Sequence, residues 1–165
     1  MGAAACFPVR GRMPTDETDQ HRWMRRACEL AARCPMSMTA FAVGAVIADR
    51  DGRLIAEGYS RDDDPYLHAE ESALRKAAGD PRLAAATMYT TLEPCTRRAS
   101  RPDTTCAGLI IAARIPRVVI AWREPDIFVT CEGVARLTAD GIEVIELPEF
   151  AAAARAANSH LNLPR

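Results

Sequence analysis

The chain has 165 residues, of which 48% are apolar and 26% charged, and its formal net charge at pH 7 is −1. This length fits one domain with one core, because a chain of this size buries most of the surface that its unfolded form exposes. No apolar run approaches the roughly 20 residues that a helix needs to cross a bilayer. The balanced charge gives no sign of a nucleic-acid partner. We therefore expect a cytoplasmic protein that acts on neither membranes nor nucleic acids.

Residues 1–20 are predicted to be a flexible leader. Their apolar stretch is short and is interrupted by Arg10, Arg12 and Pro14, which argues against a secretory signal. Without such a signal the six cysteines are not expected to form a disulfide framework. Most of them should be buried fillers, and the rest are candidates for metal ligands or nucleophiles. One globular domain is predicted over residues 21–165.

A helix and a β-hairpin are the first predicted elements. Apolar residues between positions 23 and 31 recur at helical spacing, and Pro35 prevents the helix from continuing. Two apolar, β-branched runs follow in residues 41–60. The segment DRDGR separates them, and its Asp-Gly pair is typical of a hairpin turn.

Helices and strands alternate along the rest of the chain. Residues 68–79, HAEESALRKAAG, are predicted to be a helix because carboxylates lie in the first turn, basic residues lie toward the end and a glycine follows. Further strands are predicted in ATMYTTL, RVVIAW and IEVIEL, and further helices in CAGLIIAARI, CEGVARLTAD and EFAAAARAANSHL. This alternation favours an α/β fold, a three-layer α/β/α sandwich with a mixed central sheet of about five strands.

His68, Cys95 and Cys106 are candidate metal ligands. Thiolates and imidazoles bind Zn²⁺, and a catalytic zinc site uses three protein ligands so that the fourth position can hold water. Each of these residues lies beside a predicted helix start, where unpaired N–H groups and the helix dipole favour thiolate over thiol. Glu70 lies two positions after His68, so both side chains can point to one site only if His68 is still outside the helix.

Each of these residues has a simpler interpretation when taken alone. A histidine at a helix start is usually a surface or capping group, and a free cysteine is usually a small core residue. Ten residues separate Cys95 from Cys106, unlike the two-residue spacing of a compact zinc knuckle. The interpretation as a metal site therefore depends on finding the histidine and both cysteines together in one sequence.

The segments HAE and TLEPC, followed by the cysteine that opens CAGLI, together resemble the zinc-dependent deaminase superfamily, with its H-x-E and P-C…C signature. The resemblance covers about residues 22–147. It implies a cytidine deaminase-like fold and a zinc ion held by His68, Cys95 and Cys106. It also implies that Glu70 is the catalytic proton carrier and not a ligand, which leaves Glu71 as an ordinary first-turn carboxylate.

Within that superfamily, the late second cysteine is similar to the pyrimidine deaminases of riboflavin biosynthesis. The segments FAVGAVI, GYSRD, HAEESAL, YTTLEPCTRR, REPDIFV and GIEVIEL are similar to those of the fungal-type members, in the same order. The resemblance implies a hydrolytic deaminase acting on a diaminopyrimidinone riboside or ribityl compound, with or without a phosphate. It also implies a homodimer.

Three features depart from that pattern. Ala40 occupies the position of a common asparagine that contacts the substrate ring in many relatives, which leaves the choice of ring open. The loop between the cysteines, residues 97–105, looks longer than in the relatives. The chain ends at residue 165, which leaves no room for the reductase domain that is fused to many bacterial members.

Candidate substrate contacts lie around the predicted metal site. Phe41 and the strand start beside it could line the ring, and the strand end at Thr91 could offer carbonyl groups to the amino group. Arg97, Arg98 and Arg101 lie in the loop between the two cysteines, where guanidinium groups could hold a phosphate. The same arginines could equally be solvated loop charges.

Two other functions remain open. A nucleoside or nucleobase deaminase acting on cytosine, guanine or a related ring would use the same zinc ion and glutamate. A structural zinc module would need four protein ligands, whereas the sequence offers three and a nearby glutamate. A tRNA or DNA substrate is disfavoured, because DDD at residues 62–64 places negative charge before the helix that carries the site.

Overall fold

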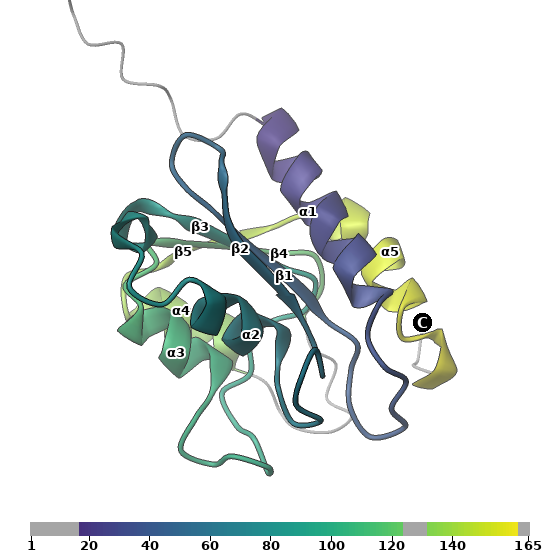
Figure 1. Cartoon of the computed structure of the whole chain (residues 1–165). Coiled ribbons are helices and arrows are strands. Elements are labelled where there is room, and N and C mark those ends of the chain that lie inside the picture. Colours follow the sequence, from purple (N-terminus) through teal and green to yellow (C-terminus); the bar gives the residue numbers. More distant parts are fainter. Residues whose placement is uncertain (1–16, 124–131, 162–165) are drawn as a thin grey trace, which may run out of the picture.

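The structure is a computed structural model that describes residues 17–123 and 132–161. At its centre lies a five-stranded sheet in the order β2-β1-β3-β4-β5 (Figure 1). The strands are β1 (Gly44–Ala48), β2 (Leu54–Tyr59), β3 (Thr87–Thr90), β4 (Arg117–Ile120) and β5 (Glu143–Glu146). β1 runs antiparallel to β2 and β3, whereas β4 runs parallel to β3 and β5. The predicted mixed sheet of about five strands is confirmed.

Helices cover both faces of the sheet (Figure 1). On one face lie α1 (Glu17–Ala31) and α5 (Ala151–Ala156), and on the other lie α2 (Ala69–Lys76), α3 (Cys106–Ala112) and α4 (Gly133–Ala139). Short 3-10 helices span Pro81–Ala85, Pro148–Phe150 and Ser159–Leu161. This is the predicted three-layer α/β/α arrangement. Among the described residues, none of the helices has the length and apolar character required to span a membrane.

Several predicted helix starts differ from the observed ones; α4 and α5, for example, each begin two residues after the start of their predicted segments. α1 begins at Glu17, so residues 17–20, predicted as the end of the leader, are helical. The segment ETDQ has no proline or glycine that would disfavour a helix. The apolar spacing that begins at residue 23 could not locate this start. α2 begins at Ala69, one residue after the predicted start. Residues 124–129, which are EPDIFV of the segment REPDIFV, and Cys131, the first residue of the predicted helix CEGVARLTAD, lie outside the described residues.

The core lies between the sheet and its two helical layers. β1 and β3 are buried along their whole length, as expected for central strands that are covered on both faces. Gly58 lets α2 approach β2 closely, because a Cβ atom there would lie 2.7 Å from the carbonyl oxygen of Ala69. This close contact fixes the first turn of α2, which carries His68 and Glu70 at its edge, against the sheet.

Candidate active site

The three predicted metal ligands meet at one end of a cavity. His68 Nδ1 lies 3.6 Å from Cys95 Sγ and 3.4 Å from Cys106 Sγ. All three ligand atoms lie within 4.8 Å of one another. Zn–S bonds of about 2.3 Å and a Zn–N bond of about 2.0 Å in tetrahedral geometry place sulfur and nitrogen ligands about 3.5 Å apart. The cluster therefore fits a zinc ion and leaves one tetrahedral position open.

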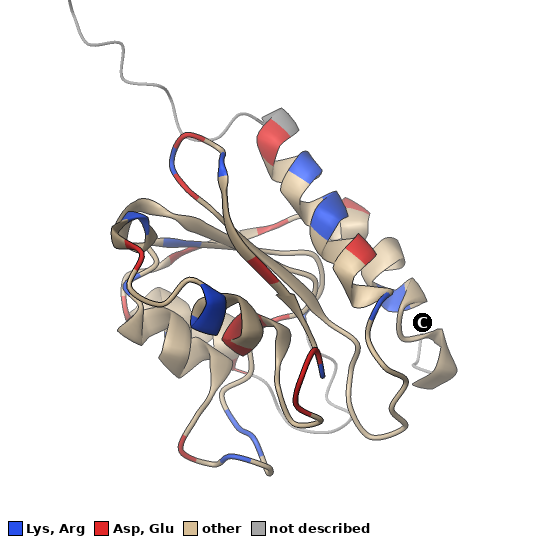
Figure 2. Cartoon of the chain, viewed as in Figure 1, with Lys and Arg blue, Asp and Glu red and all other residues tan. Residues whose placement is uncertain are grey.

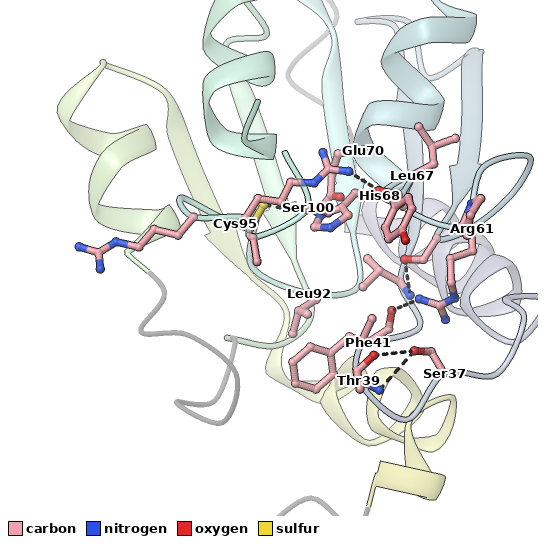
Figure 3. Close-up of a pocket in the computed structure, with 18 of the residues that line it drawn as sticks. Ser37, Thr39, Phe41, Arg61, Leu67, His68, Glu70, Leu92, Cys95 and Ser100 are labelled. Atoms are coloured by element: carbon pink, nitrogen blue, oxygen red, sulfur yellow. Dashed lines mark hydrogen bonds between the residues drawn. The ribbon is translucent and has the colours of Figure 1, made fainter. Parts of the chain in front are cut away.

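The conformation of His68 explains how it shares a site with Glu70. His68 is the N-cap residue of α2 and has extended dihedral angles, φ −87° and ψ 157°. It therefore lies outside the helix, as the prediction of a shared site required. Glu70, inside the first turn, points toward the same end of the cavity (Figure 3).

The two cysteines are brought together by the start of α3. Cys106 is the first residue of that helix, and its N–H group lies 3.5 Å from Cys95 Sγ, to which it donates a hydrogen bond. The N–H group of Ala107 donates to the carbonyl oxygen of Cys95 at 3.1 Å. The helix start thus holds the turn that carries Cys95, although ten residues separate the two ligands in the sequence.

The two thiols have opposite pKa shifts. Hydrogen bonds with Cys106 and His68, and the charge of His68, lower the pKa of the Cys95 thiol despite its burial. The hydrogen bond with Cys95, burial and the neighbouring Glu70 raise the pKa of the Cys106 thiol. A divalent cation favours the deprotonated form of both, because a metal-bound thiol loses its proton. This donor set therefore suits a bound metal ion.

Glu70 is buried beside the metal ligands, with 3% of its surface exposed. The hydroxyl group of Thr90 donates to Glu70 Oε1 at 2.9 Å, and the Cys106 thiol donates to Glu70 Oε2 at 3.2 Å. Burial raises the pKa of Glu70, because the carboxylate loses its hydration. A carboxyl group with a raised pKa is a better proton acceptor than an ordinary carboxylate and can return the proton in a later step.

A cavity of about 410 Å³ extends from the metal ligands (Figure 3). Phe41, predicted to contact the ring, lines it together with Ala40. Thr91 is not among the described residues that line the cavity, and its hydroxyl group accepts a hydrogen bond from the Gly44 N–H group at 3.2 Å. The lining also includes Ser60, Arg61, Tyr66 and Leu92, which were not predicted as substrate contacts.

Residues 17–122 match the family described as the cytidine and deoxycytidylate deaminase zinc-binding region. The chain belongs to this family. The family binds zinc, and the His–Cys–Cys cluster fits that ion, so the cofactor is Zn²⁺.

Several of the similar proteins are named as proteins of riboflavin biosynthesis, and others are named as deaminases of other substrates. The chain is 41% identical over 135 residues to the diaminohydroxyphosphoribosylamino-pyrimidine deaminase of Schizosaccharomyces pombe, covering 80% of this chain and 33% of that protein. It is 39% identical over 124 residues to the riboflavin biosynthesis protein RibD of Escherichia coli, covering 74% and 32%. The structure of Acinetobacter baumannii RibD gives a TM-score of 0.75 at 34% identity, covering 87% of this chain and 39% of that one. The chain thus spans about a third of the length of these curated relatives.

The arginines predicted to bind a phosphate differ in how they are held in this deaminase-family chain. Arg97 is exposed at the cavity and forms no ion pair within the described part of the chain. Arg98 is buried, with 2% of its side chain exposed, and donates to Glu71 Oε2 at 2.7 Å. Arg101 donates to Glu71 Oε1 at 2.8 Å. Arg98 and Arg101 therefore both form ion pairs with Glu71 inside the protein. Arg97 is the better candidate for a substrate contact.

Glu71 is not the ordinary first-turn carboxylate that the sequence predicted. It is 4% exposed, and Arg75 donates to it at 2.6 Å in addition to Arg98 and Arg101. Burial by itself would raise the pKa of Glu71, but the hydrogen bond from Arg98 and the charges of the three arginines outweigh it and lower the pKa. Glu71 thereby joins α2 to the loop that connects the two cysteines.

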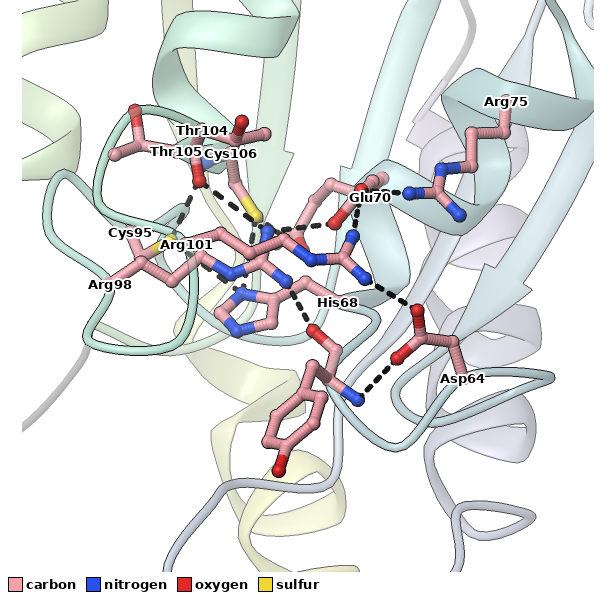
Figure 4. A network of polar contacts seen from close by, with 12 residues as sticks. Asp64, His68, Glu70, Arg75, Cys95, Arg98, Arg101, Thr104, Thr105 and Cys106 are labelled. Atoms are coloured by element: carbon pink, nitrogen blue, oxygen red, sulfur yellow. Dashed lines mark hydrogen bonds and ion pairs between the residues drawn. The ribbon is translucent and has the colours of Figure 1, made fainter.

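The loop of residues 96–105 is also tied to the acidic loop before α2 (Figure 4). Arg98 donates to the Tyr66 carbonyl oxygen, and Arg101 pairs with Asp64. Figure 2 shows the two loops with opposite charge, basic before α3 and acidic before α2. Of the described contacts between the two loops, the ion pair of Asp64 with Arg101 joins DDD to an arginine, and only the folded chain brings these two residues together.

Proposed function

We propose that this chain is a hydrolytic deaminase that replaces an exocyclic amino group of a pyrimidine-type ring. The proposed substrate is a diaminopyrimidinone riboside or ribityl compound, or its phosphate. The observation that carries the proposal is the buried Glu70 carboxyl group beside three metal ligands at one end of a cavity. The cavity volume of about 410 Å³ lies in the range of small-molecule sites. The name of the fission yeast relative supports the substrate class.

The residues would divide the reaction between them. His68, Cys95 and Cys106 would hold the zinc ion. When bound, zinc lowers the pKa of a coordinated water to about 7 and so supplies a nucleophile at neutral pH. Glu70 would accept one proton from the water and pass it to a ring nitrogen while the oxygen bonds to the ring carbon that carries the amino group. Glu70 would then take the second proton from the hydroxyl group on that carbon and pass it to the amine, so that the C–N bond breaks, ammonia leaves and a carbonyl group remains.

The substrate contacts that we propose are Phe41 for the ring and Arg97 for an anionic substituent. Phe41 packs edge to face on Trp122, with ring centroids 5.7 Å apart and an interplanar angle of 85°, so its own ring is firmly oriented. Arg97 is exposed at the cavity, and a guanidinium group can bind a phosphate through two parallel hydrogen bonds. A homodimer and a cytoplasmic location stay predictions.

The test of the proposal is Glu70→Gln, assayed by ammonia release and zinc analysis. Gln keeps the size of the side chain but cannot carry the proton, so kcat should fall by about 10²- to 10⁴-fold while zinc stays bound. Glu132→Gln, an exposed glutamate outside the cavity, is the control and should keep full activity. A fully active Glu70→Gln enzyme would contradict the assignment.

The substrate class is tested with wild-type protein. Ammonia release is measured from diaminopyrimidine riboside and ribityl compounds, with and without phosphate, and from cytidine, cytosine, adenine and guanine. Turnover of a nucleoside or nucleobase alone would replace the proposed substrate with the alternative one. Zinc binding without turnover of any of them would point to a structural site.

A further inference from the structure

Residues 42–44, which lead into β1, are held by side chains from three distant parts of the chain. Val43 exchanges two hydrogen bonds with Ser60: its N–H group donates to Ser60 Oγ at 3.2 Å, and its carbonyl oxygen accepts from the Ser60 N–H group at 2.9 Å. Gly44 exchanges two with Thr91 in the same way, at 3.2 and 3.1 Å.

Ala42 also exchanges two hydrogen bonds, and both are with the side-chain amide of Asn158, which lies just after α5. The Ala42 N–H group donates to Asn158 Oδ1 at 2.7 Å, and Asn158 Nδ2 donates to the Ala42 carbonyl oxygen at 2.9 Å. Asn158 Nδ2 also donates to the Ala154 carbonyl oxygen at 3.2 Å. Asn158 is 2% exposed, so without it both polar groups of Ala42 would be left unpaired in the interior.

The segment that Asn158 holds forms a wall of the cavity. Phe41 and Val43, on either side of Ala42, both line it, and Phe41 lies across the cavity from His68 and Glu70 (Figure 3). The C-terminal segment therefore fixes the backbone next to the aromatic ring that we assign to the substrate.

A second contact from the C-terminal segment reaches the same wall. The Arg155 guanidinium group of α5 lies 5.1 Å from the centroid of the Trp122 ring, and Trp122 in turn packs edge to face on Phe41. The C-terminal segment thus supports Phe41 through the backbone of Ala42 and through the ring of Trp122.

We propose that Asn158 is a positioning residue for the substrate ring, acting through Ala42 on Phe41. The inference rests on the proposed function. Asn158 lies outside residues 17–122, the part of the chain that matches the deaminase family. The C-terminal segment thereby supplies a support for the ring site that the matched zinc-binding region does not contain.

The experiment compares Asn158→Ala and Asn158→Asp with the wild-type chain in steady-state ammonia release. Loss of both hydrogen bonds to Ala42 lets Phe41 shift, so KM of Asn158→Ala should rise by about tenfold. The zinc content should be unchanged, and kcat should fall by less than about threefold. Asn158→Asp has the same size and keeps the acceptor for the Ala42 N–H group but loses the donor, so its KM should rise by a smaller factor.

Glu149→Gln is the matched control on the same C-terminal segment. Glu149 pairs with His21 at 3.0 Å on the surface, with half of its side chain exposed, and does not line the cavity. Its variant should have wild-type KM and kcat. A purely structural role of Asn158 would lower the melting temperature and the fraction of active enzyme, and hence kcat, with KM unchanged.

A second readout does not depend on activity. Trp23 and Trp122 are the two tryptophans, so in a Trp23→Phe background acrylamide quenching reports on Trp122 alone. Quenching should increase in Asn158→Ala and stay at the background level in Glu149→Gln.

An unchanged KM in folded, zinc-loaded Asn158→Ala overturns the inference. Should that variant fail to fold, Asn158→Asp decides by the same readouts, and a wild-type KM there overturns it. Failure of the proposed function is a separate result: wild-type protein with zinc would release no ammonia from any compound of the substrate screen, and the inference would fall with it.

Discussion

The two ends of the cavity are built in different ways. At the metal end, three residues with metal-binding side chains lie next to helix starts, and the backbone conformation of those starts brings them together. The opposite wall, around Phe41, is held by hydrogen bonds from Ser60, Thr91 and Asn158, residue types that are common anywhere in a chain. Metal binding restricts which residue types can serve as ligands. The backbone of a cavity wall, in contrast, can be held by any side chain that places a hydrogen-bond donor or acceptor at the right position.

The largest effect is expected from breaking the metal end alone. Cys106→Ala removes a proposed ligand whose sulfur lies 3.4 Å from His68 Nδ1, so zinc content should fall together with turnover. The opposite wall does not depend on the metal, so the quenching of Trp122 in the Trp23→Phe background should stay as it was. Metal analysis measures the zinc content, ammonia release measures turnover, and acrylamide quenching reports on Trp122. An unchanged zinc content would mean that another residue completes the site.

The next effect concerns the loop between the two cysteines, where two adjacent arginines differ in burial. Arg98→Leu removes the buried partner of the Glu71 carboxylate, which keeps its hydrogen bonds from Arg75 and Arg101. The free energy of unfolding should therefore fall by about 1 to 3 kcal/mol. In a chain of this size that corresponds to a fall in melting temperature of roughly 3 to 10 °C. Calorimetry of the zinc-loaded protein measures it.

Arg97→Leu is the control for that variant. Arg97 is exposed, so its replacement should change the free energy of unfolding by no more than about 0.5 kcal/mol. If a phosphorylated compound is the substrate, Arg97→Leu should instead raise KM for it. Equal destabilisation by the two replacements would show that the network around Glu71 is not what stabilises the loop.

The same contrast explains how much the sequence could predict. The order of helices and strands followed from local periodicity, and the family pattern of HAE and TLEPC, together with a late cysteine, predicted the three residues that the fold brings into one cluster. Glu71 was misjudged because a first-turn carboxylate has the same local pattern whether it is solvated or buried by a loop from residues 96–105. The bond between Asn158 and Ala42 spans 116 positions, and no local pattern marks either residue.

A smaller effect would sharpen the description of the metal end. Thr90 is fully buried, and its hydroxyl group lies 2.9 Å from Glu70 Oε1 and 3.2 Å from the Leu92 carbonyl oxygen. Thr90→Val keeps the shape and removes the hydroxyl group, so kcat should fall by about tenfold while zinc stays bound. Thr90→Ser should restore most of the loss. A Thr90→Val enzyme with wild-type kcat would show that Glu70 needs no support from β3.

The smallest effect is expected at an ion pair that lies away from both ends of the cavity. Arg26 of α1 donates two hydrogen bonds to Glu57 of β2, at 2.9 and 2.6 Å, and these lower the pKa of Glu57. The folded carboxylate therefore binds its proton less readily than the unfolded one. The stabilisation is present above the unfolded pKa of about 4.3 and is lost as the pH falls through the lower folded pKa.

Glu57→Gln should lower the free energy of unfolding by less than about 1 kcal/mol at pH 7, since about a third of each side chain is exposed. The difference from wild type should shrink as the pH falls below about 4. Urea unfolding over a pH series measures it, and Glu29→Gln, which removes the other, exposed partner of Arg26, is the control with an effect near zero. A difference that is independent of pH would rule out the ion pair as its cause. A change in zinc content or KM of Glu57→Gln would show that the packing of α1 on β2 affects the cavity. Neither the metal end of the cavity nor the wall around Phe41 would then be independent of α1.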